Sequence, residues 1–117
     1  MAIADIRRQG NVAVVKMEGR FDAVSAPDIK SQLHELIAGG SIRLVIDLAE
    51  MDFIDSAGLG VLVSSLRRTA TEGGDLQLAE VPPFCRSIFE LTRLTRVFDV
   101  TQTTEEAVAV VCGEGDG

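Results

Sequence analysis

The chain has 117 residues, of which 46% are hydrophobic and 25% are charged, and its formal net charge at pH 7 is -7. This length and composition are typical of one globular domain with a single apolar core. The acidic balance argues against a nucleic-acid-binding protein, which needs clustered lysine and arginine. No apolar run approaches the roughly 20 residues of a membrane-spanning helix, and no signal peptide is visible at the start. We therefore expect a cytoplasmic domain with no membrane insertion.

Side chains that could support metal or nucleophilic chemistry are few. The chain contains one histidine, His34, and two cysteines, Cys85 and Cys112. The cysteines are far apart and form no Cys-x-x-Cys pair, so free and at least partly buried thiols are expected. A single histidine leaves little from which to build a zinc site or a His-based catalytic triad. We expect neither a cofactor nor a metal.

The first half of the chain predicts a hairpin, a helix and a central strand. Two β-branched runs flank the turn at residues 9–11, and the segment after the second run is expected to leave the sheet. Ser25 followed by Pro27 marks a helix start, and two glycines stop that helix. Asp47 is expected to cap the turn after the central strand. The predicted strands cover residues 3–8, 11–18 and 43–48, and the helix runs from Ser25 or Ala26 to Gly39.

The second half predicts three helices separated by two short strands. A helix from Ser56 to about Glu72 carries apolar residues at helical spacing. The last helix begins at Thr103 or Thr104, where two glutamates follow. The tail, residues 113–117, has nothing to bury and is expected to be disordered, which leaves 1–112 as the single domain. The remaining predicted elements are a strand over residues 76–81, a helix lined by Phe84, Ile88 and Leu91, and a strand over residues 97–100.

The order of these elements is β-β-α-β-α-β-α-β-α. Strands that alternate with helices indicate an α/β fold with mostly parallel pairing and right-handed crossovers. The amino-terminal hairpin supplies an antiparallel edge.

The segment from Phe53 to Gly60 is the most informative part of the sequence. It joins a buried strand to an amphipathic helix and places Ser56 at the helix entrance, beside free backbone N–H groups and the positive end of the helix dipole. A serine there can cap the helix, or it can carry a phosphate that the same position tolerates. Phosphorylation adds roughly two negative charges, which is an effective way to switch a docking surface.

Two sequence signatures resemble the STAS-domain anti-sigma-factor antagonists of bacterial partner switching. Residues 19–23 with Ala26-Pro27 resemble the first signature, and residues 45–48 with 53–60 resemble the second. The resemblance covers residues 3–111 and implies a small mixed β-sheet with four α-helices. The chain departs from the family at Ala57, where a serine or threonine is common, and at residues 92–94, where a Ser-Gly-Leu sequence is common.

The resemblance implies a phosphorylation switch. Ser56 would be phosphorylated by a GHKL-type serine kinase that is also the anti-sigma factor, and a PP2C-type phosphatase would reset it. The unphosphorylated protein would bind the kinase, and the phosphorylated protein would be released. Asp22 and Asp55 would flank the phosphoacceptor. The residues expected to bind the partner are Asp22, Asp55, Ser56, Ala57, Gly58, Leu59 and Gly60.

Two alternative functions stay open at this point. The same resemblance fits a STAS subunit that docks on the ATPase of an ABC-type lipid transport system. The second alternative is a small enzyme that uses Asp22 and Asp55 as a carboxylate pair, although no base, metal-ligand set or phosphate-binding loop accompanies them.

Overall fold

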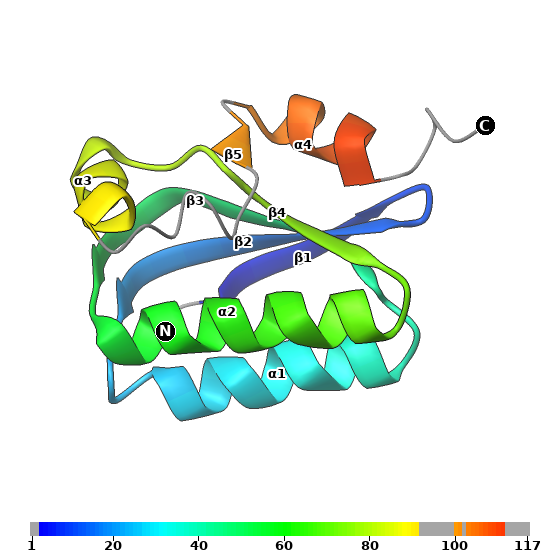
Figure 1. Ribbon diagram of the computed structural model, residues 1–117, viewed down its shortest axis with the longest axis horizontal. Coiled ribbons are helices and arrows are strands. Elements are labelled where there is room, and N and C mark those ends of the chain that lie inside the picture. Colours follow the sequence, from blue (N-terminus) through cyan, green and yellow to red (C-terminus); the bar gives the residue numbers. More distant parts are fainter. Residues whose placement is uncertain (1–2, 92–99, 102, 112–117) are drawn as a thin grey trace.

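The computed structural model describes residues 3–91, 100–101 and 103–111. Strands and helices follow one another in the predicted order (Figure 1). The strands are β1 (Ile3–Gln9), β2 (Val12–Phe21), β3 (Arg43–Ile54), β4 (Asp75–Ala79) and β5 (Val100–Thr101). The helices are α1 (Ala26–Ala38), α2 (Ser56–Thr71), α3 (Pro83–Leu91) and α4 (Thr104–Val111).

The five strands form one sheet in the order β1-β2-β3-β4-β5. β1 pairs with β2 in antiparallel fashion, and the other three pairings are parallel. The predicted mixed sheet with an antiparallel edge hairpin is therefore confirmed.

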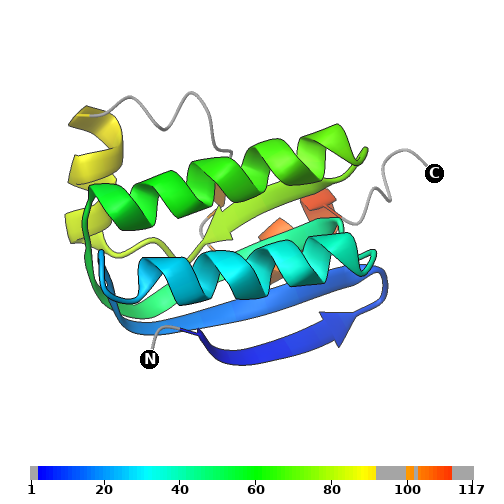
Figure 2. The ribbon, with the colours of Figure 1, turned by 90° about the horizontal axis from the view of Figure 1, so that it is seen from below.

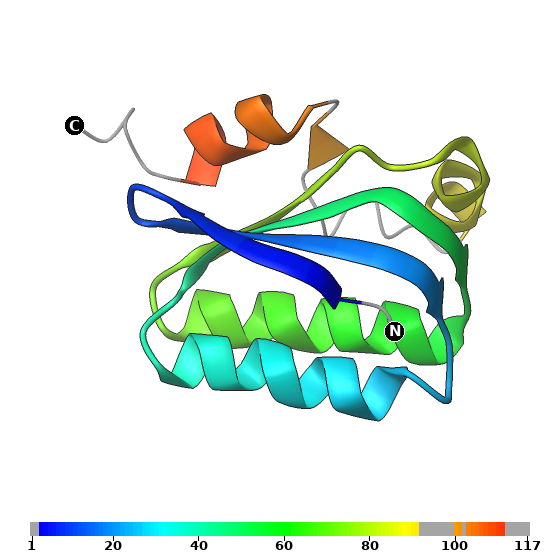
Figure 3. The same ribbon diagram turned by 180° about the vertical axis from the view of Figure 1, so that it is seen from behind.

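Helices cover both faces of this sheet. α1 and α2 lie side by side on one face and α4 lies on the other, while α3 sits at one end (Figures 2 and 3). Alternate residues of one strand serve the two faces, as Val15 belongs to the core under α1 and α2 and Val14 to the core under α4. A strand that is buried on both faces needs a continuous apolar run, which explains the unbroken sequence from Val12 to Val15.

β2 and β3 are longer than the sequence predicted. Residues 19–22 were expected to leave the sheet and β3 to end at Leu48, but the parallel pairing of the two strands continues to Phe21 and Ile54. Two register shifts interrupt the pairing without ending it, and they disturb the alternation of polar and apolar residues from which strand length is read. Asp47 consequently lies inside β3, where its carboxylate accepts the N–H of Ala49 at 3.0 Å instead of capping a turn.

The carboxy-terminal elements differ from the prediction in detail. β4 ends at Ala79, before Val81, and α3 buries Cys85 and Phe89, which leaves Phe84 39% exposed. The cap of α4 is confirmed, since the N–H of Thr103 donates to Glu106 Oε1 at 2.9 Å and the N–H of Glu106 donates to Thr103 Oγ1 at 3.1 Å. Of the predicted strand at 97–100, only Val100 falls within the described residues, and it begins β5. Cys112, residues 92–94 and the tail 113–117 also lie outside them.

Two further predictions concern the cysteine thiols and membrane-spanning helices, and the described residues bear on both. Cys85 is a free thiol, and burial raises its pKa to about 11, so it is an unreactive core residue. None of the described helices is long and apolar enough to cross a membrane.

Candidate functional site

The candidate site lies where β2 and β3 end next to each other. Phe21 and Ile54 are paired at the ends of the two strands, and the N–H of Asp55 donates to the carbonyl of Phe21 at 3.3 Å. Each strand is followed by a connection to a helix. The loop from β2 to α1 and the first turn of α2 are therefore neighbours at one end of the molecule (Figures 1 and 2).

Asp55, and not Ser56, is the N-cap of α2. Its backbone is extended, with φ -119° and ψ -171°, and its Oδ1 accepts the N–H groups of Ala57 at 2.9 Å and Gly58 at 3.1 Å. Of the two roles that the sequence allowed for Ser56, the helix cap is excluded, because Asp55 satisfies those donors. Ser56 is the exposed first residue of α2, and among the described residues its hydroxyl bonds to neither Asp22 nor Asp55. The hydroxyl is therefore open to solvent.

Asp55 also holds the loop between β2 and α1. Its second oxygen, Oδ2, accepts the N–H of Ala23 at 3.1 Å, so one carboxylate joins two segments that are 32 residues apart in the sequence. Hydrogen bonds from the loop and from the first turn of α2 thus hold Asp55, the residue that precedes Ser56.

Asp22 organises the same loop from within. Its Oδ1 accepts the N–H groups of Val24 at 3.0 Å and Ser25 at 3.1 Å, and its Oδ2 accepts Arg20 Nε at 3.1 Å. The hydrogen bond from the Ser25 backbone, followed by that from Arg20, lowers the pKa of Asp22 below its ordinary value. Asp22 is therefore an ionised acceptor that shapes the loop.

Ser25 precedes α1, as predicted, but its hydroxyl does not bond to the helix. Ser25 Oγ accepts the N–H of Asp22 at 3.1 Å and donates to the carbonyl of Arg20 at 2.9 Å. The side chain closes the loop, and the fixed φ of Pro27 near the helix start favours the first turn of α1.

Comparisons with known proteins identify the family of the chain. The family model described as STAS domain matches residues 4–107. The chain belongs to the STAS domain family.

Three proteins that are similar to this STAS domain cover nearly all of it. The anti-sigma-B factor antagonist of Bacillus subtilis is 30% identical over 104 residues, which are 89% of this chain and 94% of that protein. A solved anti-sigma factor antagonist from Mycobacterium paratuberculosis is 27% identical, with a TM-score of 0.82 over 91% of this chain and 90% of that one. The Bacillus cell fate determinant SpoIIAA in its phosphorylated form is 20% identical over 90% of this chain and 96% of that one. Its TM-score of 0.70 shows the shared fold alone.

The two glycines of the candidate site, Gly58 and Gly60, have different surroundings. Gly58 is buried, and a Cβ on it would lie 2.5 Å from the carbonyl oxygen of Phe21 and 2.8 Å from Ile54 Cγ1. Gly60 is exposed, and a Cβ there would meet nothing within 4 Å. Gly58 thus lets the helix start approach β2, whereas packing within the domain does not require Gly60 to be glycine.

The seven residues predicted to bind a partner lie together, but they are unequally accessible. Ser56 and Gly60 are exposed, and Gly58 is buried. The others are half-buried, and two of these, Ala57 and Leu59, pack against the core. The structure thus leaves Ser56, Gly60 and the loop carboxylates as the accessible part of the set.

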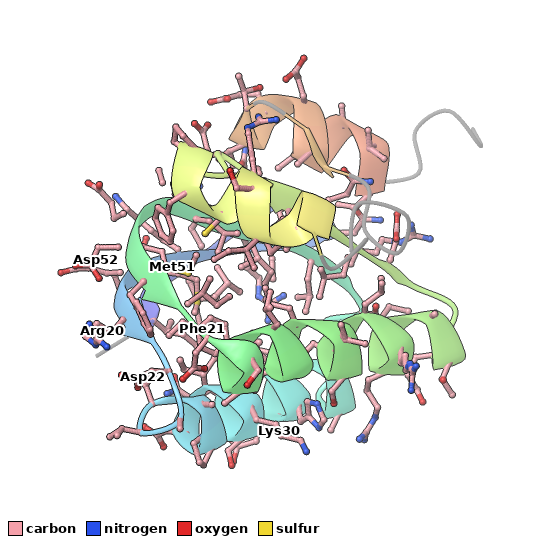
Figure 4. All side chains as sticks on the ribbon, turned by 60° about the vertical axis from the view of Figure 1, so that its left-hand side comes forward. Arg20, Phe21, Asp22, Lys30, Met51 and Asp52 are labelled. Atoms are coloured by element: carbon pink, nitrogen blue, oxygen red, sulfur yellow. The ribbon has the colours of Figure 1, made fainter. Side chains whose placement is uncertain are left out.

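Sequence reasoning missed one part of this STAS site. The guanidinium of Arg20 lies over the ring of Phe53, 4.1 Å from its centroid, while its Nε bonds to Asp22. Figure 4 shows Arg20 and Asp22 at the end of β2, on the side of the molecule where Met51 and Asp52 of β3 also lie. Arg20 stands within the first signature and Phe53 within the second, and only the long parallel pairing of β2 and β3 brings them together.

Proposed function

We propose that this STAS domain is an anti-sigma-factor antagonist whose binding to an anti-sigma factor is controlled by phosphorylation of Ser56. The unphosphorylated form binds a GHKL-type serine kinase that is also the anti-sigma factor, and the phosphorylated form is released. A PP2C-type phosphatase resets the switch in the cytoplasm. The observation that carries the proposal is the exposed, uncommitted hydroxyl of Ser56 at the first position of α2.

The surroundings of Ser56 explain how a phosphate would change binding. A phosphate at the start of a helix is favoured by the helix dipole and by nearby N–H groups. In this domain, however, Asp55 already accepts the N–H groups of Ala57 and Gly58. A phosphate therefore adds about two negative charges next to the carboxylate of Asp55, and those two N–H groups are not free to offset them. An acidic partner surface that tolerates the hydroxyl would be repelled by the phosphoserine.

The carboxylates themselves support a regulatory protein and not an enzyme. Asp22 and Asp55 accept six N–H groups in total, five from the backbone and one from Arg20. A general acid needs a carboxyl that holds its proton near neutral pH, whereas the lowered pKa of Asp22 favours the ionised form. Within the described residues no cluster of three or more His, Cys, Asp or Glu is placed to hold a metal.

The named relatives also bear on the transporter alternative. Both sequence-similar proteins described above are named as anti-sigma factor antagonists, which supports that function over a docking subunit of an ABC-type lipid transport system. Tight binding to an ABC ATPase, without phosphorylation by any kinase tested, would favour the docking subunit.

A phosphorylation assay tests the proposal directly. The purified chain is incubated with ATP and a GHKL-type serine kinase from the same organism, and phosphate is located by mass spectrometry. We expect phosphate on Ser56, none in Ser56→Ala, and normal phosphorylation of Ser31→Ala, which removes another exposed helical serine. Kinase affinity should fall when wild type is phosphorylated. Phosphate at another residue, or unchanged affinity after modification of Ser56, would contradict the proposal.

A further inference from the structure

We propose that the end of β2 and the loop that joins it to α1 carry a second contact for the same partner, formed by Val24 of the loop as an apolar anchor and Arg20 of β2 as a fixed cation. We call these two residues the loop anchor. This inference rests on the proposed function, because the occupant is the kinase that acts on Ser56. The partner surface that fits the loop anchor is an apolar pocket flanked by a carboxylate.

Val24 is the most exposed large hydrophobic side chain in the described part of the chain. It is 89% exposed, compared with 52% for Val110 and 39% for Phe84. A single exposed apolar residue is common on protein surfaces and carries little meaning alone. The position of Val24 gives it meaning, since it follows directly after Ala23, which is bonded to the residue that precedes Ser56. A protein that encloses Ser56 in its active site would meet this loop.

The loop is ordered before any partner arrives. The N–H of Val24 donates to Asp22 Oδ1, the N–H of Ala23 donates to Asp55 Oδ2, and the hydroxyl of Ser25 donates to the carbonyl of Arg20. Binding through a segment that is already fixed loses less conformational entropy than binding through a loop that must be ordered. The apolar side chain of Val24 is therefore presented to a partner at low entropic cost.

Arg20 is held in a similar way. Phe53 supports its guanidinium at 4.1 Å and Asp22 binds its Nε, while the side chain stays 62% exposed. Within the described residues its two terminal nitrogens have no protein partner, and they form the planar fork that recognises a carboxylate in bidentate fashion. Arginine is enriched among residues that dominate binding energy at interfaces. A partner carboxylate is consequently the expected ligand of Arg20.

Matched substitutions in the full chain test this inference. Kinase affinity is measured for Val24→Asp and Arg20→Ala, with Val110→Asp on α4 and Arg67→Ala on α2 as controls of the same chemistry at exposed positions elsewhere. We expect a loss of about tenfold or more for each loop variant and a change within about twofold for each control. Circular dichroism verifies folding, and Val24→Ala replaces Val24→Asp if the charged variant does not fold.

The outcomes separate this inference from the function on which it rests. If wild type binds the kinase and is phosphorylated on Ser56, but both loop variants bind within about twofold of wild type, the loop anchor is overturned and the proposed function stands. If wild type neither binds nor is phosphorylated, both fail. If Val24→Asp abolishes concentration-dependent self-association in sedimentation and leaves kinase affinity unchanged, the occupant is a second copy of the chain and the inference is overturned.

Discussion

The carboxylate of Asp55 accepts the N–H of Ala23 through Oδ2 at 3.1 Å while its Oδ1 caps α2. The same side chain therefore sets the start of the helix that bears Ser56 and the position of the neighbouring loop. Two substitutions separate these roles, because asparagine is a good N-cap but has only one accepting oxygen, whereas alanine accepts nothing.

Asp55→Asn should keep the helix cap and lose the bond to Ala23, at a cost of about 1 kcal/mol in the free energy of unfolding. Asp55→Ala should lose both interactions, at a cost of about 2 kcal/mol. Chemical denaturation measures the free energy of unfolding of each variant, and amide hydrogen exchange shows which of the two interactions has been lost. In the asparagine variant exchange should rise at Ala23 and stay slow at Gly58. Equal stability of the two variants would show that Asp55 does not cap α2.

The glycine pair predicts opposite effects of one added methyl group. Gly58→Ala should lower the free energy of unfolding by about 1–3 kcal/mol, because the new Cβ collides with backbone at Phe21. Gly60→Ala should raise it by about 1 kcal/mol, because alanine is the better helix former and the space is open. Thermal or urea unfolding measures both changes. A less stable Gly60→Ala variant would contradict the open space around a Cβ at this position.

If the surface at Gly60 contacts the kinase, the same Gly60→Ala variant should bind it more weakly although it is more stable. A binding assay run beside the unfolding experiment distinguishes contact from folding. Unchanged kinase affinity in Gly60→Ala would place that residue outside the interface.

Charge at position 56 should by itself release the kinase. Ser56→Asp adds a carboxylate next to Asp55 and should reduce affinity about tenfold or more, whereas Ser56→Asn is similar in size and neutral and should retain most of it. Calorimetry at low and high salt adds a check, since the difference between the two variants should shrink as salt screens the charges. Undiminished binding of Ser56→Asp would count against the electrostatic account.

The only histidine gives the fold a pH dependence that can be isolated. His34 Nε2 lies 3.2 Å from Ser64 Oγ between α1 and α2, and desolvation, followed by the charges of Arg68 and Lys30, lowers its pKa below 6.5. The unfolded chain therefore takes up the proton first, and stability should fall as pH decreases through 6.5 toward the folded pKa, with no further loss from His34 below it. His34→Gln should lack this component. If wild type and His34→Gln lose the same stability as the pH falls, His34 is not the source of this pH dependence.

One buried hydroxyl can be removed with benefit. Ser65 on α2 is fully buried, and its Oγ has no hydrogen-bond partner. Ser65→Ala should stabilise the domain by about 1 kcal/mol, since it removes an unsatisfied polar atom and improves helix propensity. Ser31→Ala on the exposed face of α1 should gain only the smaller stabilisation that comes from better helix propensity. Unfolding midpoints compare them, and a destabilised Ser65→Ala would show that the hydroxyl is satisfied in solution.

The sequence was sufficient for the order of the elements because hydrophobic periodicity reports burial directly. The apolar run at Leu44–Ile46 and the spacing of Leu62 and Leu66 place β3 and α2 correctly. The ends of β2 and β3 were missed because residues 18–20 and 49–52 carry exposed polar groups between register shifts. Strand pairing, which links positions far apart in the chain, decided those boundaries.

The residues of the candidate site could be named from the sequence, but the hydrogen bonds among them could not be assigned. Aspartate and serine are both favoured N-caps, so the sequence alone allows either Asp55 or Ser56 to cap α2. The extended backbone of Asp55 identifies it as the cap. The Arg20–Phe53 contact and the bond from Ala23 to Asp55 join segments more than 30 residues apart, and no local pattern reports such contacts.

All the hydrogen bonds that fix Ser56 and its loop join residues between Arg20 and Leu59, within β2, β3 and the starts of α1 and α2. Of the elements after β4, β5 extends the sheet at one margin and α3 sits at one end, whereas α4 packs on the second face of the sheet, where Ala107 and Val111 share a core with Val14. The exposed residues of α3 and α4 can therefore change to suit a new output without breaking these hydrogen bonds, whereas their buried residues cannot change freely. One domain thus holds the switch in its hydrogen bonds and an adaptable surface on its last helices.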